Sequence, residues 1–189
     1  DETLKLFAVT DLSQPFVREV LQDEILHLHG NFTGETAERL EVIFRHLGLQ
    51  EDSLARLKSK RWHIVARGMR ELAFMNVKEA IEPISHFLES KNEMLRYEAR
   101  ITTMKLKEND PLSFLDHEKG QLSEWDQSYI FTMLCKMPES SVPDFSRWIV
   151  SSNPTVVDFA IAMIGAFHQQ QSVSKLLSML EDSDETRRI

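Results

Sequence analysis

Four polar residues recur along the second half of this chain at nearly constant spacing. Asn92, Ser123, Asn153 and Asp184 each stand directly before a run of periodic apolar residues, and their separations are 31, 30 and 31 residues. All four are residue types whose side chains accept hydrogen bonds from the free amides that open a helix. We therefore predict that a unit of about 31 residues, beginning with a helix, repeats through this part of the chain.

The stretch 61–92 shows the expected content of one unit. Apolar residues within 62–73 fall on one stripe of an α-helix. Asn76 is then predicted to cap a second helix, with Glu79 completing a capping box, and Pro83 to kink that helix or delay its start. The turn between the two helices is short, so they are expected to pack antiparallel, because only then can both bury their apolar stripes.

The apolar core positions recur with the same period as the caps. Ala66, Ala99, Ile130 and Ile161 are 33, 31 and 31 residues apart. A first helix with small central residues, a short turn with Asn or Asp, and a second helix ending in Phe-Leu or Leu-Leu resemble HEAT repeats. That resemblance implies an all-α, right-handed α-solenoid of about five stacked antiparallel helix pairs, with first helices convex and second helices concave. Tetratricopeptide repeats, the competing interpretation, have a Trp-Leu-Gly-Tyr and Ala-Phe-Pro spacing that is not kept here.

The repeat length divides the whole chain into predicted parts. They are an N-terminal arm at 1–12, an atypical helix pair plus a bridging helix at 13–58, four HEAT-like repeats at 59–92, 93–122, 123–153 and 154–184, and the start of a truncated further repeat at 185–189. Gly30 and Gly48 are expected to end the two helices of the atypical pair. The bridging helix is expected at 52–58. Terminal units of such arrays usually differ from the central ones, because one of their faces has no neighbour.

Residues 185–189 line up with the opening of the preceding repeat, and there the chain stops. A solenoid does not normally end with its last apolar stripe uncovered, so the chain is expected to be a fragment of a longer protein. Some bacterial HEAT-repeat proteins of similar general organisation carry an N-terminal membrane segment before the array. That resemblance implies a cytoplasmic domain that meets a membrane only through a tether outside this chain.

Composition limits the kinds of partner. The chain of 189 residues has a net charge of −8, which argues against general binding to phosphate backbones, because such binding requires an excess of Lys and Arg. No apolar run approaches the roughly 20 residues that span a bilayer. The one cysteine, Cys135, can form no internal disulfide. It shares a predicted apolar stripe with Phe131 and Leu134, so a buried free thiol is expected.

No catalytic, cofactor-binding or metal-binding residue is predicted, and the chain is not expected to be an enzyme. His27 and His29 are two residues apart. On a helix such positions point about 200° apart, so the two rings do not converge on a metal ion. The sequence contains no Gly-rich phosphate loop, no Gly-x-Ser-x-Gly elbow and no Cys-x-x-Cys pair. Its many carboxylates fit the solvated sides of helices.

One basic cluster stands out in this acidic chain and is the candidate site for an anionic partner. It comprises Arg56, Lys58, Lys60, Arg61, Arg67 and Arg70. A plain solvated helix face is the preferred interpretation. Nucleic acid is the alternative, because some DNA-repair glycosylases resemble stacked HEAT-like repeats and use a basic groove with Trp and Asp. Here Trp62, Trp125 and Trp148 all fall on predicted core stripes, which argues against that use.

The expected function is protein–protein interaction, as a scaffold or adaptor without catalysis, because stacked repeats expose a long, rigid and shallow face. The partner would be another protein, contacted by polar residues of the second helices. The candidates are Lys78, Glu82, Ser85, His86, Glu89, Arg147 and Ser174. The last repeat also resembles the HEAT-type repeats named after phycobilisome lyases, so a bilin lyase-type enzyme is a further alternative. The sequence supplies no reactive group for bilin transfer, and a repeat match does not carry an activity.

Overall fold

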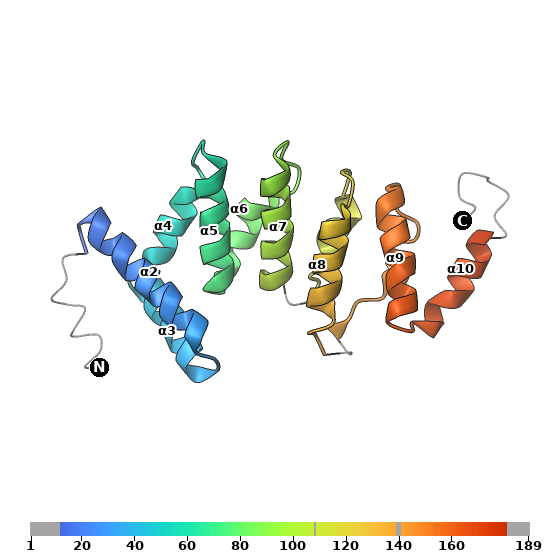
Figure 1. Cartoon of the computed structure of the whole chain (residues 1–189), viewed down its shortest axis with the longest axis horizontal. Helices are drawn as coiled ribbons and strands as arrows, with labels where there is room; N and C mark the ends of the chain where they lie inside the picture. Colours follow the sequence, from blue (N-terminus) through green and yellow to red (C-terminus); the bar gives the residue numbers. More distant parts are fainter. Residues whose placement is uncertain (1–11, 108, 139–140, 181–189) are drawn as a thin grey trace.

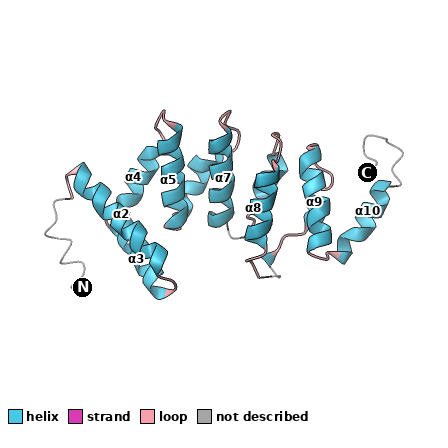
Figure 2. Ribbon diagram, viewed as in Figure 1, coloured by secondary structure: helices cyan, strands magenta, loops and turns pink. Residues whose placement is uncertain are grey.

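The computed structural model describes residues 12–107, 109–138 and 141–180, and within them the chain is helical and contains no strand (Figure 2). This confirms the predicted all-α class. The predicted arm lies outside the described residues except for residue 12, and so do Asp184 and the predicted further repeat at 185–189.

Nine α-helices and four short 3-10 helices lie in the described part of the chain. The α-helices are α2 (Pro15–Asn31), α3 (Glu35–His46), α4 (Leu49–Arg56), α5 (Trp62–Phe74), α6 (Ile81–Ser85), α7 (Glu93–Leu106), α8 (Glu124–Leu134), α9 (Pro154–Ala166) and α10 (Val173–Leu180). The 3-10 helices are η1 (Lys78–Ala80), η2 (Ser113–His117), η4 (Phe145–Arg147) and η5 (Gln170–Ser172). We name α5, α7, α8 and α9 the first helices, and η1–α6, η2, η4 and η5–α10 the second segments that follow them.

The first helices stand side by side in a single row along the long axis of the molecule (Figure 1). Each begins at the same edge of the row, uppermost in Figure 1, so the four helices are parallel. Hydrogen bonds link neighbouring connections at this edge, since the Asn153 side chain donates to the carbonyls of Glu118 and Gly120 at 2.9 and 2.8 Å. We call this the upper edge, and it comprises residues 57–62, 89–94, 119–125 and 150–155.

Three of the predicted helix caps are confirmed. The side chains of Asn92, Ser123 and Asn153 accept backbone N–H groups in the first turns of α7, α8 and α9. Ser123 also forms a capping box with Asp126, whose carboxylate accepts from the Ser123 backbone N–H at 3.0 Å. Pro154 occupies the opening of α9, where its missing N–H removes no helical hydrogen bond.

The predicted role of Asn76 is wrong, because this residue ends α5 instead of starting the next helix. Its φ is 49°, in the left-handed region, and the following residue, Val77, donates its N–H back to the Leu72 carbonyl at 2.9 Å. This backbone arrangement closes a helix C-terminus, and Asn tolerates it better than most residues do. His168 adopts the same conformation after α9, with a φ of 50°.

The second segments are shorter than the first helices. After the turn that follows α5, a 3-10 turn over Lys78–Ala80 precedes α6, so the α-helix begins only two residues before Pro83, in agreement with a delayed start. In the second predicted repeat, η2 is a five-residue 3-10 helix, and in the third, η4 has three residues. The predicted helix pairs therefore consist of one long helix and one short, partly 3-10 segment.

Apolar side chains pack in two clusters that follow each other along the row. The first joins α2 to α7 and includes Phe44, Met69 and Leu72, each fully buried. The second joins the end of α7 to α9 and centres on Phe145 and Trp148. Each such large side chain stabilises the fold by about 1.5–3 kcal/mol when it leaves water. The core is thus distributed along the molecule, and the partly buried Leu88 packs against both clusters.

Two of the tryptophans and the cysteine do not lie where the apolar stripes predicted. Trp62 and Trp125 are exposed, whereas Trp148 is buried as expected. Cys135 is also exposed. Trp62 and Trp125 occupy the first turns of α5 and α8, and Cys135 is the residue that follows α8, so all three lie at helix ends.

The boundaries of the N-terminal helices differ from the prediction at two points. Helix α2 continues past Gly30 by one residue instead of ending there. A Cβ atom at Gly30 would lie 3.4 Å from the Phe74 ring, which is an ordinary van der Waals contact, and the helix continues through this residue. The bridging helix α4 spans Leu49–Arg56, not 52–58. Gly48 ends α3 as predicted, with a φ of 64°.

Gly68 allows the close packing of α5 on α4. A Cβ atom there would lie 2.8 Å from the Ser53 carbonyl oxygen and 2.9 Å from the Arg56 Cβ atom. Because neither atom belongs to the flexible end of a side chain, alanine at this position would push the helices apart. We expect Gly68→Ala to lower the free energy of unfolding by about 1–3 kcal/mol in urea denaturation.

Gly165 provides the matched control for this substitution. It also lies within a first helix, but a Cβ atom there meets nothing within 4 Å. We expect Gly165→Ala to leave the free energy of unfolding unchanged or to raise it by up to about 1 kcal/mol, since alanine is the better helix former. Equal losses in both variants would contradict the close contact between α4 and α5.

Candidate functional site

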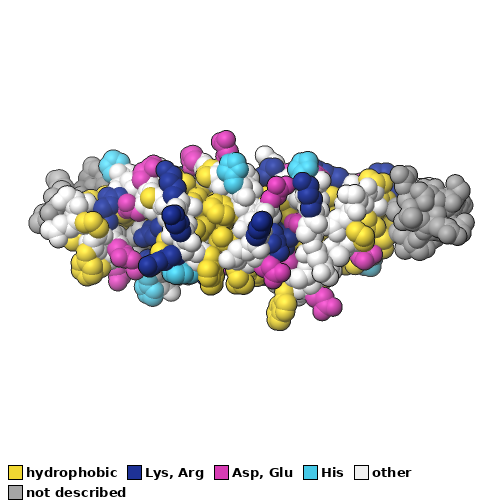
Figure 3. Space-filling view, turned by 90° about the horizontal axis from the view of Figure 1, so that it is seen from above, with side chains coloured by type: hydrophobic (Ala, Val, Ile, Leu, Met, Phe, Trp, Pro, Cys, Tyr) yellow, Lys and Arg dark blue, Asp and Glu magenta, His cyan; other side chains and the backbone are white. Residues whose placement is uncertain are grey.

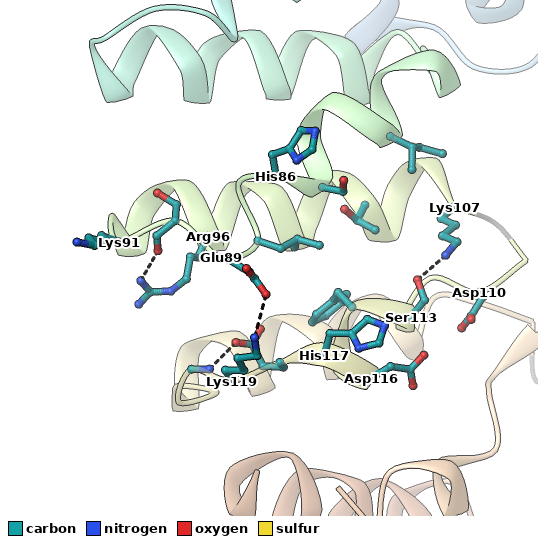
Figure 4. Close-up of a pocket in the computed structure, with 18 of the residues that line it drawn as sticks. His86, Glu89, Lys91, Arg96, Lys107, Asp110, Ser113, Asp116, His117 and Lys119 are labelled. Carbon is teal, nitrogen blue, oxygen red and sulfur yellow. Dashed lines mark hydrogen bonds and ion pairs between the residues drawn. The ribbon is translucent and has the colours of Figure 1, made fainter. Parts of the chain in front are cut away.

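A groove runs along the second segments of three consecutive units, α6, η2 and η4. It consists of two adjoining hollows of about 1020 Å³ and 560 Å³. Their linings share Glu89, Asp116, His117, Glu118, Lys119 and Arg147, so the two hollows form one continuous surface. Figure 4 shows the larger hollow, in which side chains from α6, the segment before α7, and η2 face one another.

The groove is lined by side chains of both charges over a partly apolar floor. Its cations are Lys91, Arg96, Lys107, Lys119 and Arg147, and its carboxylates are Glu89, Asp110, Asp116 and Glu118. The floor includes Ile81, Leu88 and Phe114. His86 and His117 add two imidazoles to the lining (Figure 4). A surface of this kind offers hydrogen bonds and ion pairs of either sign beside apolar contact.

Arg147 joins η4 to the preceding unit from the rim of the groove. Its guanidinium donates to Asp110 at 3.0 Å and to Asp116, and it lies over the Trp148 ring, 5.2 Å from the ring centroid. Hydrogen bonding to Asp110 is the main cause of the raised pKa of Arg147, and Asp116 adds to it. Trp148 Nε1 also donates to Asp116 at 2.9 Å. Arg147 is therefore held in place, although its side chain reaches solvent.

The two ends of the larger hollow carry different contacts. At one end Lys119 Nζ lies 3.5 Å from Glu89 Oε1, and both side chains are well exposed. At the other end Lys107 Nζ donates to the Ser113 hydroxyl at 2.7 Å, near Asp110 (Figure 4). Exposed ion pairs contribute only about 0–1 kcal/mol, so a bound molecule could replace the Lys119–Glu89 contact at little cost.

A buried ion cluster lies directly beneath the groove. Arg100 of α7 donates through Nε to Glu118 at 2.9 Å and through Nη1 to Asp126 at 2.8 Å, and all three residues are buried. The second Glu118 oxygen, Oε1, accepts the Gly120 N–H at 2.9 Å. Asn153 then connects the Glu118 and Gly120 carbonyls to α9. The cluster thus fixes the positions of α7, the segment before α8, α8 and α9 relative to one another.

A second buried polar cluster centres on Glu71 of α5. Its Oε2 atom accepts from Gln22 at 2.9 Å, Ser53 at 2.8 Å and Arg56 at 2.9 Å. Its Oε1 atom accepts from Arg67 at 2.7 Å. The hydrogen bond that Arg67 donates to Glu71 is the largest cause of the raised pKa of Arg67. This cluster joins α2, α4 and α5.

The predicted basic cluster is therefore divided by the structure. Arg56 and Arg67 are engaged in internal ion pairs with Glu71. Arg70 is exposed but lies 3.6 Å from Glu98. The remaining three members, Lys58, Lys60 and Arg61, are exposed on the upper edge. The six cations consequently do not form one surface for an anionic partner.

The predicted protein-binding residues divide in a similar way. Ser85, His86, Glu89 and Arg147 line the groove. Lys78, Glu82 and Ser174 also belong to second segments but are not part of its lining. Sequence reasoning missed the contribution of η2 and its flanks, which is Lys107, Asp110, Ser113, Asp116, His117 and Lys119. These residues lie in or beside the second helix that was predicted for the repeat at 93–122, and this position could have indicated that they join the same surface.

Asp144 holds the start of η4, next to the groove. Its carboxylate accepts the Ser146 N–H at 2.9 Å, the Ser146 hydroxyl at 2.9 Å and the Ser172 hydroxyl at 3.0 Å. Burial opposes ionisation of Asp144, but these hydrogen bonds and the charge of Lys175 outweigh it, and the pKa of Asp144 is lowered. Asp144 thereby connects η4 to η5 of the following unit.

Comparisons of the chain with known protein families, curated proteins and solved structures found no match. The resemblance to HEAT repeats accordingly remains a prediction. Within residues 12–107, 109–138 and 141–180, no group of three or more His, Cys, Asp or Glu is arranged to hold a metal ion. None of the helices in that part of the chain is long and apolar enough to cross a bilayer.

Removal of the Arg100 charge should strongly destabilise the protein. Arg100→Leu leaves the carboxylates of Glu118 and Asp126 buried without a cation, and breaking a buried ion pair in this way costs about 3–5 kcal/mol. Arg39→Leu is the control, because Arg39 pairs with Glu35 in a largely exposed i,i+4 contact and should cost under about 1 kcal/mol. Both values are measured as free energies of unfolding in urea. A loss in Arg100→Leu no larger than in the control would contradict the structural role of the cluster.

Asp144 should contribute to stability only while it is ionised. Because the folded-state pKa of Asp144 is lowered, its contribution is fully present above its unfolded-state pKa and is lost as the pH falls through the lowered value. We expect Asp144→Asn to be less stable than the parent chain at neutral pH, and the difference to shrink towards acid pH. Urea denaturation of both proteins along a pH series measures this. A difference that stays constant with pH would contradict it.

Proposed function

We propose that this chain is an α-solenoid of HEAT-like repeats and serves as a non-catalytic adaptor that binds another protein along the groove. The observation that supports the proposal is the continuity of the groove across α6, η2 and η4. A groove that crosses several units suits an extended polypeptide segment better than a small molecule, because small-molecule sites are more enclosed and mostly apolar.

The chemistry of the groove favours a partner segment that carries both charges. Lys119 and Glu89 lie at one end of the larger hollow and Lys107 at the other, with Ile81, Leu88 and Phe114 between them. A partner would gain affinity mainly from apolar side chains placed on that floor, since such anchors dominate protein interfaces. The charges around them would set the register and exclude segments of the wrong charge pattern.

Two sets of ion pairs, one of them buried, favour tight binding because they hold the groove in one shape. Arg100, Glu118 and Asp126 lie under the larger hollow, and Arg147 fixes η4 against η2 through Asp110 and Asp116. A surface that is already ordered loses little conformational entropy when a partner binds, so more of the contact energy appears as affinity.

The proposal is tested by charge reversal in the groove with a matched change outside it. The full chain carries an affinity tag, and proteins that co-purify from the source cells are identified by mass spectrometry. Glu89→Lys places an opposite charge in the groove. Glu82→Lys makes the same change on the neighbouring α6, at an exposed residue outside the groove lining.

We expect a specific protein to co-purify with the parent chain and with Glu82→Lys, and to be lost or reduced at least tenfold with Glu89→Lys. A loss of at least tenfold corresponds to about 1.4 kcal/mol or more of binding free energy. Peptides that tile the recovered protein then identify the bound segment by isothermal titration calorimetry. Equal recovery with all three proteins, or no specific protein with any of them, would contradict the proposal.

A further inference from the structure

One large apolar side chain is exposed at each of the four connections that form the upper edge. Trp62 is 45% exposed, Met94 49%, Trp125 84% and Val150 79%. Three of them lie in the first turn of a first helix, and Val150 lies shortly before α9. The four connections are neighbours along the row (Figure 1), so the apolar side chains recur along one border of the molecule. Single exposed apolar residues are ordinary, whereas a series at equivalent places suggests a partner surface.

The same edge carries an excess of positive charge in an acidic chain. The segments that define the upper edge contain the exposed cations Lys58, Lys60, Arg61, Lys91 and Lys119. Their exposed carboxylates are Glu89, Glu93 and Glu124. The edge therefore has five cations against three carboxylates, although the whole chain has a net charge of −8. Viewed from this side in Figure 3, Lys and Arg side chains are spread over much of the length of the molecule.

The direction of the first helices adds to this positive potential. All four begin at the upper edge (Figure 1), so the partial positive charges of their N-termini lie along it. The cations of the 57–62 segment are also free to meet a partner: no ion pair is found for Lys58, Lys60 or Arg61 with any described residue. Arg56 and Arg67, by contrast, are neutralised by Glu71.

We propose that the upper edge docks on an anionic lipid surface. Such a surface accepts both features of the edge: its phosphate groups attract the lysines and Arg61, and its interfacial region accepts tryptophan and other apolar side chains. A nucleic acid fits less well, because Met94 and Val150 offer no ring for base stacking and the phosphate backbone gains nothing from exposed aliphatic groups.

This surface overlaps the groove at one end. The two share Glu89, Ser90, Lys91, Lys119, Gly120 and residues 150–152, where the groove opens towards the edge (Figure 4). The rest of the groove lies along α6, η2 and η4, away from Trp62 and Trp125. A chain docked through its upper edge would present the groove beside the lipid surface. The lipid proposal does not rest on the proposed protein partner, and either can fail alone.

Co-sedimentation with vesicles tests the proposal. The full chain is mixed with vesicles of phosphatidylcholine alone, or of phosphatidylcholine with 30% phosphatidylglycerol. We expect binding to the anionic vesicles only, weakening as salt rises because the attraction is electrostatic. Each lysine near an anionic membrane surface contributes about fivefold to the affinity, so Lys58→Gln with Lys60→Gln should weaken binding roughly 25-fold.

Lys105→Gln with Lys136→Gln is the matched control. Both residues are exposed and lie away from the upper edge, Lys105 in the last turn of α7 and Lys136 two residues after the end of α8. We expect this variant to bind anionic vesicles as the parent chain does. Equal weakening in the two double variants would overturn the proposal, as would binding of both vesicle types with the same affinity. Binding to duplex DNA or single-stranded RNA without binding to anionic vesicles would also overturn it.

Tryptophan fluorescence gives a second, independent measurement. Brominated lipids quench only those indoles that reach the bilayer, so Trp62 and Trp125 should be quenched and the buried Trp148 should not. In a chain with Trp62→Phe and Trp125→Phe, only Trp148 remains, and we expect quenching by anionic brominated vesicles to disappear. Quenching that persists in this variant would show that another part of the chain contacts the lipid, and would overturn the assignment to the upper edge.

Discussion

The guanidinium of Arg100 is the contact on which the C-terminal half of the molecule depends. From α7 it reaches Glu118 in the next connection and Asp126 in the first turn of α8, and all three side chains are nearly removed from solvent. Charges in such a place are tolerated only when paired and hydrogen-bonded, so these segments can bury them in one register alone. Asp126 also completes the capping box of Ser123, so one carboxylate sets both the start of α8 and its position against α7.

The N-terminal half uses a different set of residues for the same purpose. The Glu71 carboxylate accepts hydrogen bonds from residues of α2, α4 and its own helix, and Arg56 and Arg67 are the cations among these donors. Between the two halves, α5 meets α7 mainly through apolar contact, with Ala66 and Ala99 fully or almost fully buried. The nearest charged contact there, Arg70 to Glu98, is 3.6 Å long, and burial raises the pKa of Glu98. This junction therefore rests on packing, whereas the junctions on either side of it also rest on buried charge.

Local signals in the sequence predicted the first helices well. They could not predict the contacts between residues that are distant in the sequence. The side chains of Asn92 and Ser123 bond to backbone N–H groups only two or three residues further on, so the local sequence is enough to predict these caps. The prediction for Asn76 failed because asparagine has two roles at helix ends: it caps the start of a helix, and it tolerates the left-handed conformation that ends one. Neither role can be assigned until the neighbouring elements are known.

The candidate sites were less predictable than the fold, because their character depends on distant partners. Arg67 looks like a surface cation in the sequence, but two of its partners, Glu19 and Asp23, are 48 and 44 residues away. Likewise, helical periodicity assigns Trp125 to an apolar stripe but does not show that the neighbouring helix leaves its first turn uncovered. The groove was anticipated only in part, through Ser85, His86, Glu89 and Arg147, because the shortness of η2 brings its flanks into the lining.

Both proposed surfaces follow from one asymmetry between the first helices and the second segments. Because the first helices are parallel, all of their N-termini and preceding connections share one edge, and whatever those connections expose is repeated along it. Because η2 and η4 are shorter than α7 and α8, they do not fill the space beside them, and a groove remains. The Arg100 cluster touches both surfaces, since Glu118 lines the groove and Asp126 accepts from Ser123 of the upper edge, whereas Glu71 lines neither hollow. The exposed side chains of the edge and the groove, such as Trp125 and Glu89, take no part in these buried clusters, so they can vary without removing the contacts that hold the row together.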